Sequence, residues 1–109
     1  MVVVTGIVEI CIHESRSLKE KRSVLRSMLR RTQNEFNVSI AEVGCMDNWK
    51  IGRIGFALVG NDASFLNSKA DKILRFMEDL YLAEIVKSKI EIMTLSEEAL
   101  PFYGEGEHK

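Results

Sequence analysis

The sequence has little cysteine, a single proline and no long apolar run. Its 109 residues include two cysteines, Cys11 and Cys45, too few for the disulfide framework of a small secreted domain. No apolar segment approaches the roughly 20 residues that a membrane span needs. The apolar start, Met1 to Gly6, carries no basic segment or cleavage site typical of a signal peptide. These absences predict a cytoplasmic protein with no membrane partner.

Known catalytic and cofactor-binding motifs are also missing. The sequence contains no phosphate-binding loop, dinucleotide fingerprint, nucleophile elbow or zinc-protease helix motif. A metal site built from Cys11, Cys45 and His13 would take its ligands from two elements with no close spacing between them. We therefore expect no enzymatic activity, no catalytic residue, no metal and no cofactor.

The charge is unevenly placed along a chain of ordinary composition. The net charge is -1, and 46% of the residues are apolar and 28% are charged. This net charge gives no argument for a nucleic-acid partner. However, the segment from Arg16 to Arg31 holds seven basic residues and one acid, a local charge of +6, whereas Thr94 to Lys109 has a charge of -3. This asymmetry indicates either an anionic partner or one part of the chain neutralising another.

Hydrophobic periodicity predicts six elements. The expected order is strand 2–12, a helix from Ser17 to Phe36, strands 38–43 and 51–59, a helix after Gly60-Asn61-Asp62, and strand 85–93. The seven residues between the two middle strands suit a hairpin and not a crossover. This β-α-β-β-α-β order predicts an α+β, ferredoxin-like fold, with two helices on one face of a four-stranded antiparallel sheet. The domain would span 1–94, and 95–109 would be an acidic tail with a short helix over 96–100.

Side-chain roles follow from the same pattern. Ser17 and Glu20 have the spacing of a capping box, in which Glu20 reaches back to the Ser17 amide. Lys21 points into the apolar arc of the first helix, but a long stem in the first turn can extend to water. In the last strand Val86, Ile90 and Ile92 should face inward with Ser88. The open face should carry the polar residues Thr5, Glu9, Lys87, Lys89 and Glu91, with Glu9 paired to Lys87 or Lys89.

Three stretches resemble a known family. They are Ser17-Leu18-Lys19-Glu20-Lys21-Arg22, Phe36-Asn37-Val38-Ser39-Ile40-Ala41-Glu42-Val43, and Asp47-Asn48-Trp49 with Asn61-Asp62. Together they resemble the YlxP-like family of small bacterial proteins of unknown function, over most of residues 1–94. The resemblance implies a ferredoxin-like fold and a gene neighbourhood that, in some bacteria, includes translation factors and a ribosome-binding factor. It implies no established activity, substrate or catalytic residue.

A row of basic residues on the first helix is the leading candidate site. Lys19, Arg22, Arg26 and Arg30 stand at i, i+3, i+7 and i+11, along one flank of the helix. Aligned guanidinium groups suit repeated phosphates. The alternative is that the row serves solubility or pairs with acids nearby. The acids available for such pairing are Glu97, Glu98, Glu105 and Glu107.

The hairpin and the sheet offer weaker candidates. RNA-binding domains with this strand order stack bases on sheet aromatics, but Phe56 is the only aromatic of its strand and is expected in the core. Trp49 could bind a partner from the hairpin loop, or fold back to close the end of the core.

Two functions remain open. The first is an RNA- or ribosome-associated accessory protein that binds phosphate backbone through Arg22, Arg26 and Arg30, with Lys50 and Arg53 as outlying contacts. The second is an interaction module that forms a homodimer through the sheet face or the edge strands, with no nucleic-acid role.

Overall fold

The computed structural model describes residues 1–99 and contains the six predicted elements in the predicted order. They are β1 (Val2–Cys11), α1 (Leu18–Glu35), β2 (Ser39–Gly44), β3 (Ile51–Gly60), α2 (Ala63–Asp79) and β4 (Glu84–Thr94). The predicted strand boundaries differ from these by one residue at most. A short 3-10 turn follows β4 at Glu97–Ala99.

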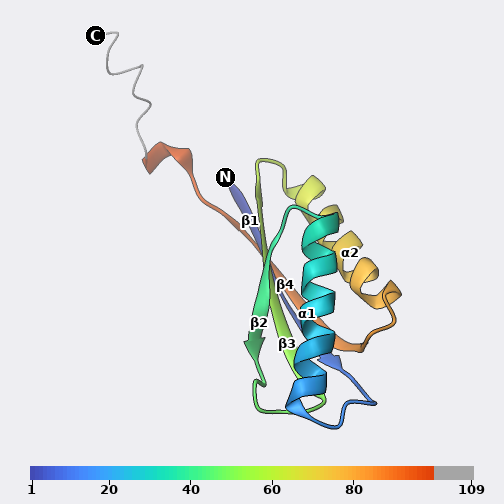
Figure 1. Cartoon of the computed structure of the whole chain (residues 1–109). Helices are drawn as coiled ribbons and strands as arrows, with labels where there is room; N and C mark the ends of the chain where they lie inside the picture. Colours follow the sequence, from blue (N-terminus) through green and yellow to red (C-terminus); the bar gives the residue numbers. More distant parts are fainter. Residues whose placement is uncertain (100–109) are drawn as a thin grey trace, which may run out of the picture.

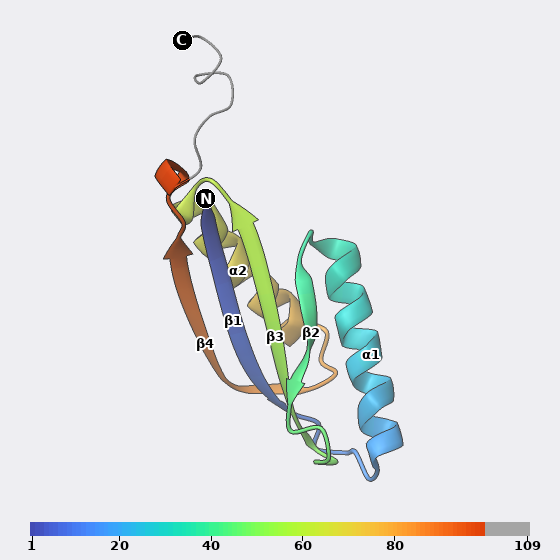
Figure 2. The same cartoon turned by 90° about the vertical axis from the view of Figure 1, so that its left-hand side faces the viewer.

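The strands form one antiparallel sheet in the order β2-β3-β1-β4. Both helices cover the same face of this sheet, and the opposite face is open (Figure 1). Figure 2 looks onto the open face, with α2 behind the strands and α1 beside β2. The arrangement confirms the predicted ferredoxin-like fold.

Alternation along the strands builds the core between sheet and helices. Val4, Val8 and Ile10 of β1 are fully buried, and Phe56 of β3 lies among them on the helix-covered side. A Cβ added to Gly6 would lie 2.4 Å from two carbons of the Phe56 ring. The missing side chain at this position therefore lets the ring lie against β1.

Both helices begin at a side-chain cap. The Ser17 hydroxyl accepts the amide N–H of Glu20 at 3.1 Å, and the Asp62 carboxylate accepts the amide N–H of Phe65 at 3.0 Å. The Glu20 carboxylate accepts the N–H of Arg16 at 2.6 Å, and not that of Ser17 as the capping box predicts. The bonds to the Glu20 and Phe65 amides each satisfy a backbone donor that the helix leaves unpaired. Within residues 1–99, neither helix has the length and apolarity required to cross a membrane.

The prediction that Lys21 reaches water is wrong. Its side chain is 0% exposed, and its Nζ lies 3.3 Å from the Glu42 Oε2 on β2. The same Nζ donates a 2.5 Å hydrogen bond to the backbone oxygen of Cys45. The Glu42 Oε2 has no aligned hydrogen-bond donor, so its contact with Lys21 is mainly a charge interaction. β2 and the loop after it therefore bury Lys21, although its position in the pattern of α1 alone would leave it near solvent.

The prediction for the inward face of β4 is partly wrong because of a β-bulge. The register between β1 and β4 shifts between Glu9 and Ile10, so Ile85 stands opposite Ile10. Val86 is consequently 50% exposed, and Ile85 packs against the core in its place. One extra residue in a strand reverses the face of every residue before it.

The described part of the acidic tail lies away from α1. Glu97 and Glu98 are exposed in the 3-10 turn, which stands beyond the end of β4 (Figure 1). Neither carboxylate is within ion-pair distance of a cation among residues 1–99. The predicted pairing partners Glu105 and Glu107 lie outside the described residues.

Candidate nucleic-acid interface

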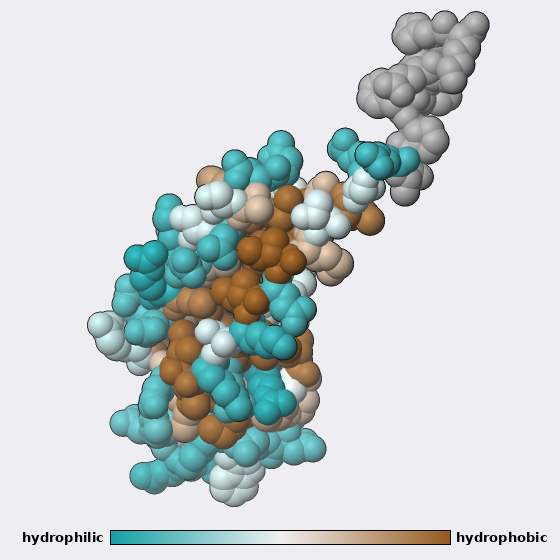
Figure 3. All heavy atoms as spheres, turned by 180° about the vertical axis from the view of Figure 1, so that it is seen from behind, coloured by the Kyte–Doolittle hydropathy of each residue, from teal (hydrophilic) through white to brown (hydrophobic). Residues whose placement is uncertain are grey.

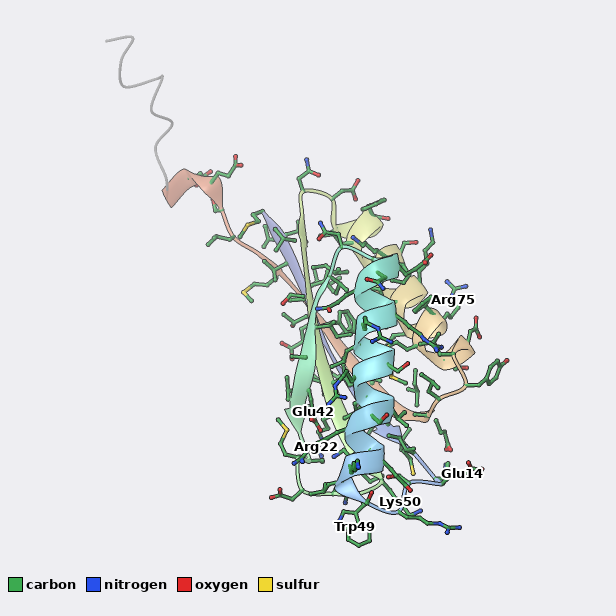
Figure 4. The ribbon with its side chains drawn as sticks, viewed as in Figure 1. Glu14, Arg22, Glu42, Trp49, Lys50 and Arg75 are labelled. Carbon is green, nitrogen blue, oxygen red and sulfur yellow. The ribbon has the colours of Figure 1, made fainter. Side chains whose placement is uncertain are left out.

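Four cations form a row along α1. Lys19, Arg22, Arg26 and Arg30 are all exposed, and their three- and four-residue spacing keeps them on one flank. At a rise of about 1.5 Å per residue, the row is about 16 Å long. Arg22 lies on the side of α1 that faces β2 (Figure 4). The row is therefore a linear positive surface along the β2 side of the helix.

No carboxylate of residues 1–99 lies within ion-pair distance of these four side chains. Two acids close to the row have other partners. Glu20 accepts the backbone N–H of Arg16, and Glu42 faces the buried ammonium of Lys21. Within the described chain, the positive charge of the row is available to an external anion.

The structure separates the two outlying cations. Lys50 lies at the end of the molecule where α1 begins (Figure 4), and its Nζ donates to the backbone oxygen of His13. Arg53 projects from the open sheet face, where its Nε lies 3.1 Å from Glu9 Oε1. Lys87 Nζ lies 3.9 Å from the other oxygen of Glu9, as cross-strand pairing predicts. The fold thus brings Lys50 toward the row and places Arg53 on the opposite side of the sheet.

The other flank of α1 borders an acidic groove. This groove, of about 930 Å³, lies between the first turns of α1, the end of α2 and the start of β4. Four carboxylates line it: Glu14, Glu20, Glu78 and Glu84. Phosphate would be repelled there, so α1 separates a cationic flank from an anionic one.

The groove also contains a cluster of Cys11, His13 and Glu84 that the sequence alone does not reveal. Cys11 Sγ lies 3.6 Å from His13 Nδ1, and His13 Nε2 lies 3.1 Å from Glu84 Oε2. The pairing of β1 with β4 brings Glu84 opposite Cys11, a register that no local motif shows. The imidazole could accept the thiol proton, but His13 and Glu84 are 67% and 57% exposed, and water competes for such bonds. Among residues 1–99, no three potential ligands gather as a metal site.

Hydrogen bonds fix the hairpin loop between β2 and β3. The backbone oxygen of Cys45 accepts the Lys21 Nζ at 2.5 Å and the Asn48 N–H at 3.1 Å. The Asn48 side-chain oxygen accepts the N–H groups of Lys50 at 2.9 Å and Ile51 at 2.8 Å. The loop is therefore tied both to itself and to the first turns of α1.

Trp49 projects from this fixed loop. Its side chain is 56% exposed and points away from the body of the molecule, at the same end as Lys50 and Arg22 (Figure 4). The alternative in which Trp49 folds back to close the core is wrong, because the residue is exposed. Trp49 is thus an exposed aromatic residue on a hydrogen-bonded loop near the start of the cationic row.

The open sheet face offers no aromatic platform on its central strands. Phe56 is 4% exposed and faces the helices, as expected for a core residue. Instead, the open face carries half-exposed aliphatic side chains, including Ile7 at 50%, Val59 at 65% and Met93 at 61%. Figure 3, seen from the β4 side, shows apolar residues gathered along this edge of the sheet.

Comparison with known proteins identifies relatives without a described activity. A family model described as "Protein of unknown function (DUF503)" matches residues 3–90. "Uncharacterized protein YlxP" of Bacillus subtilis (strain 168) is 40% identical over 70 residues, which are 64% of this chain and 76% of that protein. These matches confirm the YlxP-like resemblance.

Solved structures support the fold alone. The de novo designed protein Foldit4 aligns with a TM-score of 0.50 at 17% identity, covering 88% of this chain and all 100% of the design. SnoaB, a cofactor-independent oxygenase from Streptomyces nogalater, aligns with a TM-score of 0.50 at 13% identity, covering 88% of this chain and 95% of the oxygenase. At these low identities, the similarity shows only that the strands and helices are arranged alike.

Proposed function

The chain belongs to the DUF503 family of proteins of unknown function, and from its own surface we propose that it is a cytoplasmic, RNA- or ribosome-associated accessory protein. In this proposal α1 binds phosphate backbone through Lys19, Arg22, Arg26 and Arg30. Lys50 extends the contact at the start of the helix, and Arg53 takes no part. The supporting observation is a row of exposed cations with no carboxylate partner among residues 1–99.

The spacing of the row suits a polyanion better than a single ion. Successive cations are three or four residues apart, about 5 to 6 Å along the helix axis, so several can meet successive phosphates of one strand. Arginine makes bidentate phosphate contacts, and each phosphate neutralised releases counterions. The acidic groove on the far flank of α1 restricts such a ligand to the β2 side.

Fluorescence anisotropy with a labelled RNA hairpin that carries a single-stranded tail tests this proposal. Four phosphate contacts predict that affinity falls about 50-fold between 50 and 200 mM salt, at the slope expected for single strands. The variant Arg22→Glu with Arg26→Glu should lose most of the binding.

A matched charge reversal on the other helix provides the control. Lys72 and Arg75 are exposed on α2, so Lys72→Glu with Arg75→Glu changes the net charge equally without touching the row. This variant should retain binding. Equal loss in both double variants, or affinity that does not change with salt, would contradict the proposal.

A second candidate function is supported by the open sheet face. Ile7, Val59 and Met93 expose at least half of their side chains there, and β4 is an edge strand. Such a face suits a second copy of the chain. Sedimentation at about 100 μM protein, a concentration that populates even micromolar dimers, would then give a dimer that Val59→Lys dissociates. A monomer at that concentration would exclude this candidate.

A further inference from the structure

An exposed aromatic residue, Trp49, stands at the end of the cationic row. Phe56 is buried, and Phe36 packs edge-to-face on Phe76 at 5.5 Å between ring centroids. Trp49, by contrast, is 56% exposed. An exposed indole on a loop gains nothing for the core, so its surface is available for a ligand.

The loop presents this indole without needing to be ordered on binding. Cys45 and Asn48 accept four hydrogen bonds that set the loop's path. One of these comes from Lys21 in α1, so the loop is fixed to the same helix turn that carries Lys19 and Arg22. A preformed aromatic surface binds more tightly than a mobile one because less conformational freedom is lost.

Cations lie near the indole, in a loop that also holds Asp47. Lys50 follows Trp49 in sequence, and Arg22 lies at the same end of the molecule (Figure 4). Among residues 1–99, two other exposed aromatics have no such cation row beside them. Tyr81 is 87% exposed but lines the acidic groove, and Phe65 is 66% exposed in the first turn of α2, whose cap is Asp62.

We propose that Trp49 stacks on an unpaired base, and that the RNA bound along α1 is therefore single-stranded. This inference rests on the proposed function. Bases in a duplex are stacked on their neighbours inside the helix, whereas an unpaired base offers its whole face to an aromatic side chain. The phosphates of the same strand then follow the row from Lys19 toward Arg30.

The test exploits the single tryptophan of the chain. The protein is titrated with a 12-nucleotide adenosine RNA, an abasic 12-mer and a 12-base-pair duplex, at low salt. Indole fluorescence reports stacking, and anisotropy of a label on each oligonucleotide reports binding. The adenosine strand should quench the indole, whereas the abasic strand and the duplex should bind without quenching it.

Variants separate stacking from charge. Trp49→Ala should weaken binding of the adenosine strand about 5- to 100-fold, the range of one base stack, and leave duplex binding unchanged. Trp49→Phe should restore part of the affinity. Phe65→Ala removes another exposed aromatic, in the first turn of α2, and should change nothing.

The failures of the two proposals are distinguishable. If none of the three oligonucleotides binds, both the phosphate-binding function and the stacking inference are wrong. If all three bind but the indole is not quenched and Trp49→Ala has no effect, only the stacking inference is wrong. The folded state of Trp49→Ala, checked by circular dichroism, should match the unchanged chain because the indole is exposed.

Discussion

At the scale of residues, the pair of Lys21 and Glu42 stands out. The ammonium is completely out of solvent and 3.3 Å from a carboxylate whose side chain is 23% exposed. Removing a charge from water is costly, and the attraction between the partners offsets that cost only while both are present. The pair therefore contributes little net stability but makes each partner sensitive to loss of the other.

Lys21→Ala should lower the free energy of unfolding by about 3 kcal/mol, because it leaves Glu42 without its counter-charge and removes one of the two donors to the Cys45 oxygen. Lys21→Met with Glu42→Leu should recover most of this loss. Lys19→Met, at an exposed position nearby, should change stability by less than about 0.5 kcal/mol. Urea unfolding measures all three, and a loss in Lys21→Ala no larger than in Lys19→Met would contradict the account.

How well a residue's burial can be predicted from the sequence depends on which parts of the chain supply its contacts. The sequence predicts the burial of Phe56 because alternation within its own strand determines its face. It does not predict the burial of Lys21, because the partners of that side chain come from β2 and the following loop. The exposure of Trp49 likewise depends on contacts between elements, which local spacing does not encode. The position of Arg53, in contrast, follows from alternation within β3, because it faces away from Ile54 and Phe56.

At the scale of elements, α1 carries a different chemistry on each side. One side packs on the sheet, one presents the row, and one borders the acidic groove. The order of the elements could be predicted from periodicity and from capping residues. The bulge in β4 could not, because Ile85 and Val86 are adjacent and both apolar, so either one could face the core.

Loss of the α1 cap should weaken the fold without removing any cation. Ser17→Ala eliminates the acceptor of the Glu20 N–H and should reduce the free energy of unfolding by about 1 kcal/mol. Ser17→Asp keeps an acceptor and should remain close to the unchanged chain. Thermal unfolding followed by circular dichroism compares the two, and identical midpoints for the alanine and aspartate variants would refute the cap's role.

At the scale of the whole molecule, the net charge of -1 gives no sign of how unevenly charge is distributed over the surface. The cationic row, the acidic groove and the aliphatic sheet face occupy three separate surfaces. The total charge therefore says little about partners, whereas the distribution along α1 does.

The domain should fold without the residues after Leu95. Every residue of the core cluster and its packed neighbours lies between Val2 and Ile90, and the Leu95 N–H donates to Met1 at 2.8 Å. A chain that ends at Leu95 should thus melt within about 2 °C of the full chain, a shift worth under 1 kcal/mol.

A chain that ends at Lys89 provides the matched control. It loses half of β4 together with Ile90, and it should be unfolded or melt far lower. A large loss of stability in the chain ending at Leu95 would place an essential contact in the acidic tail.

The position of β1 in the sheet has a consequence for biosynthesis. β1 is the first strand to be translated, yet it lies between β3 and β4, and Val2 pairs with Thr94. One edge of β1 can pair once β3 has emerged, at Gly60, whereas the other edge stays unpaired until β4 has emerged, at Thr94. Long-range pairing of this kind slows folding, so one edge of an apolar strand stays exposed until the last strand of the sheet is made. We expect the sheet to be completed only when β4 becomes available, and until then the open edge of β1 is a site for pairing with another chain.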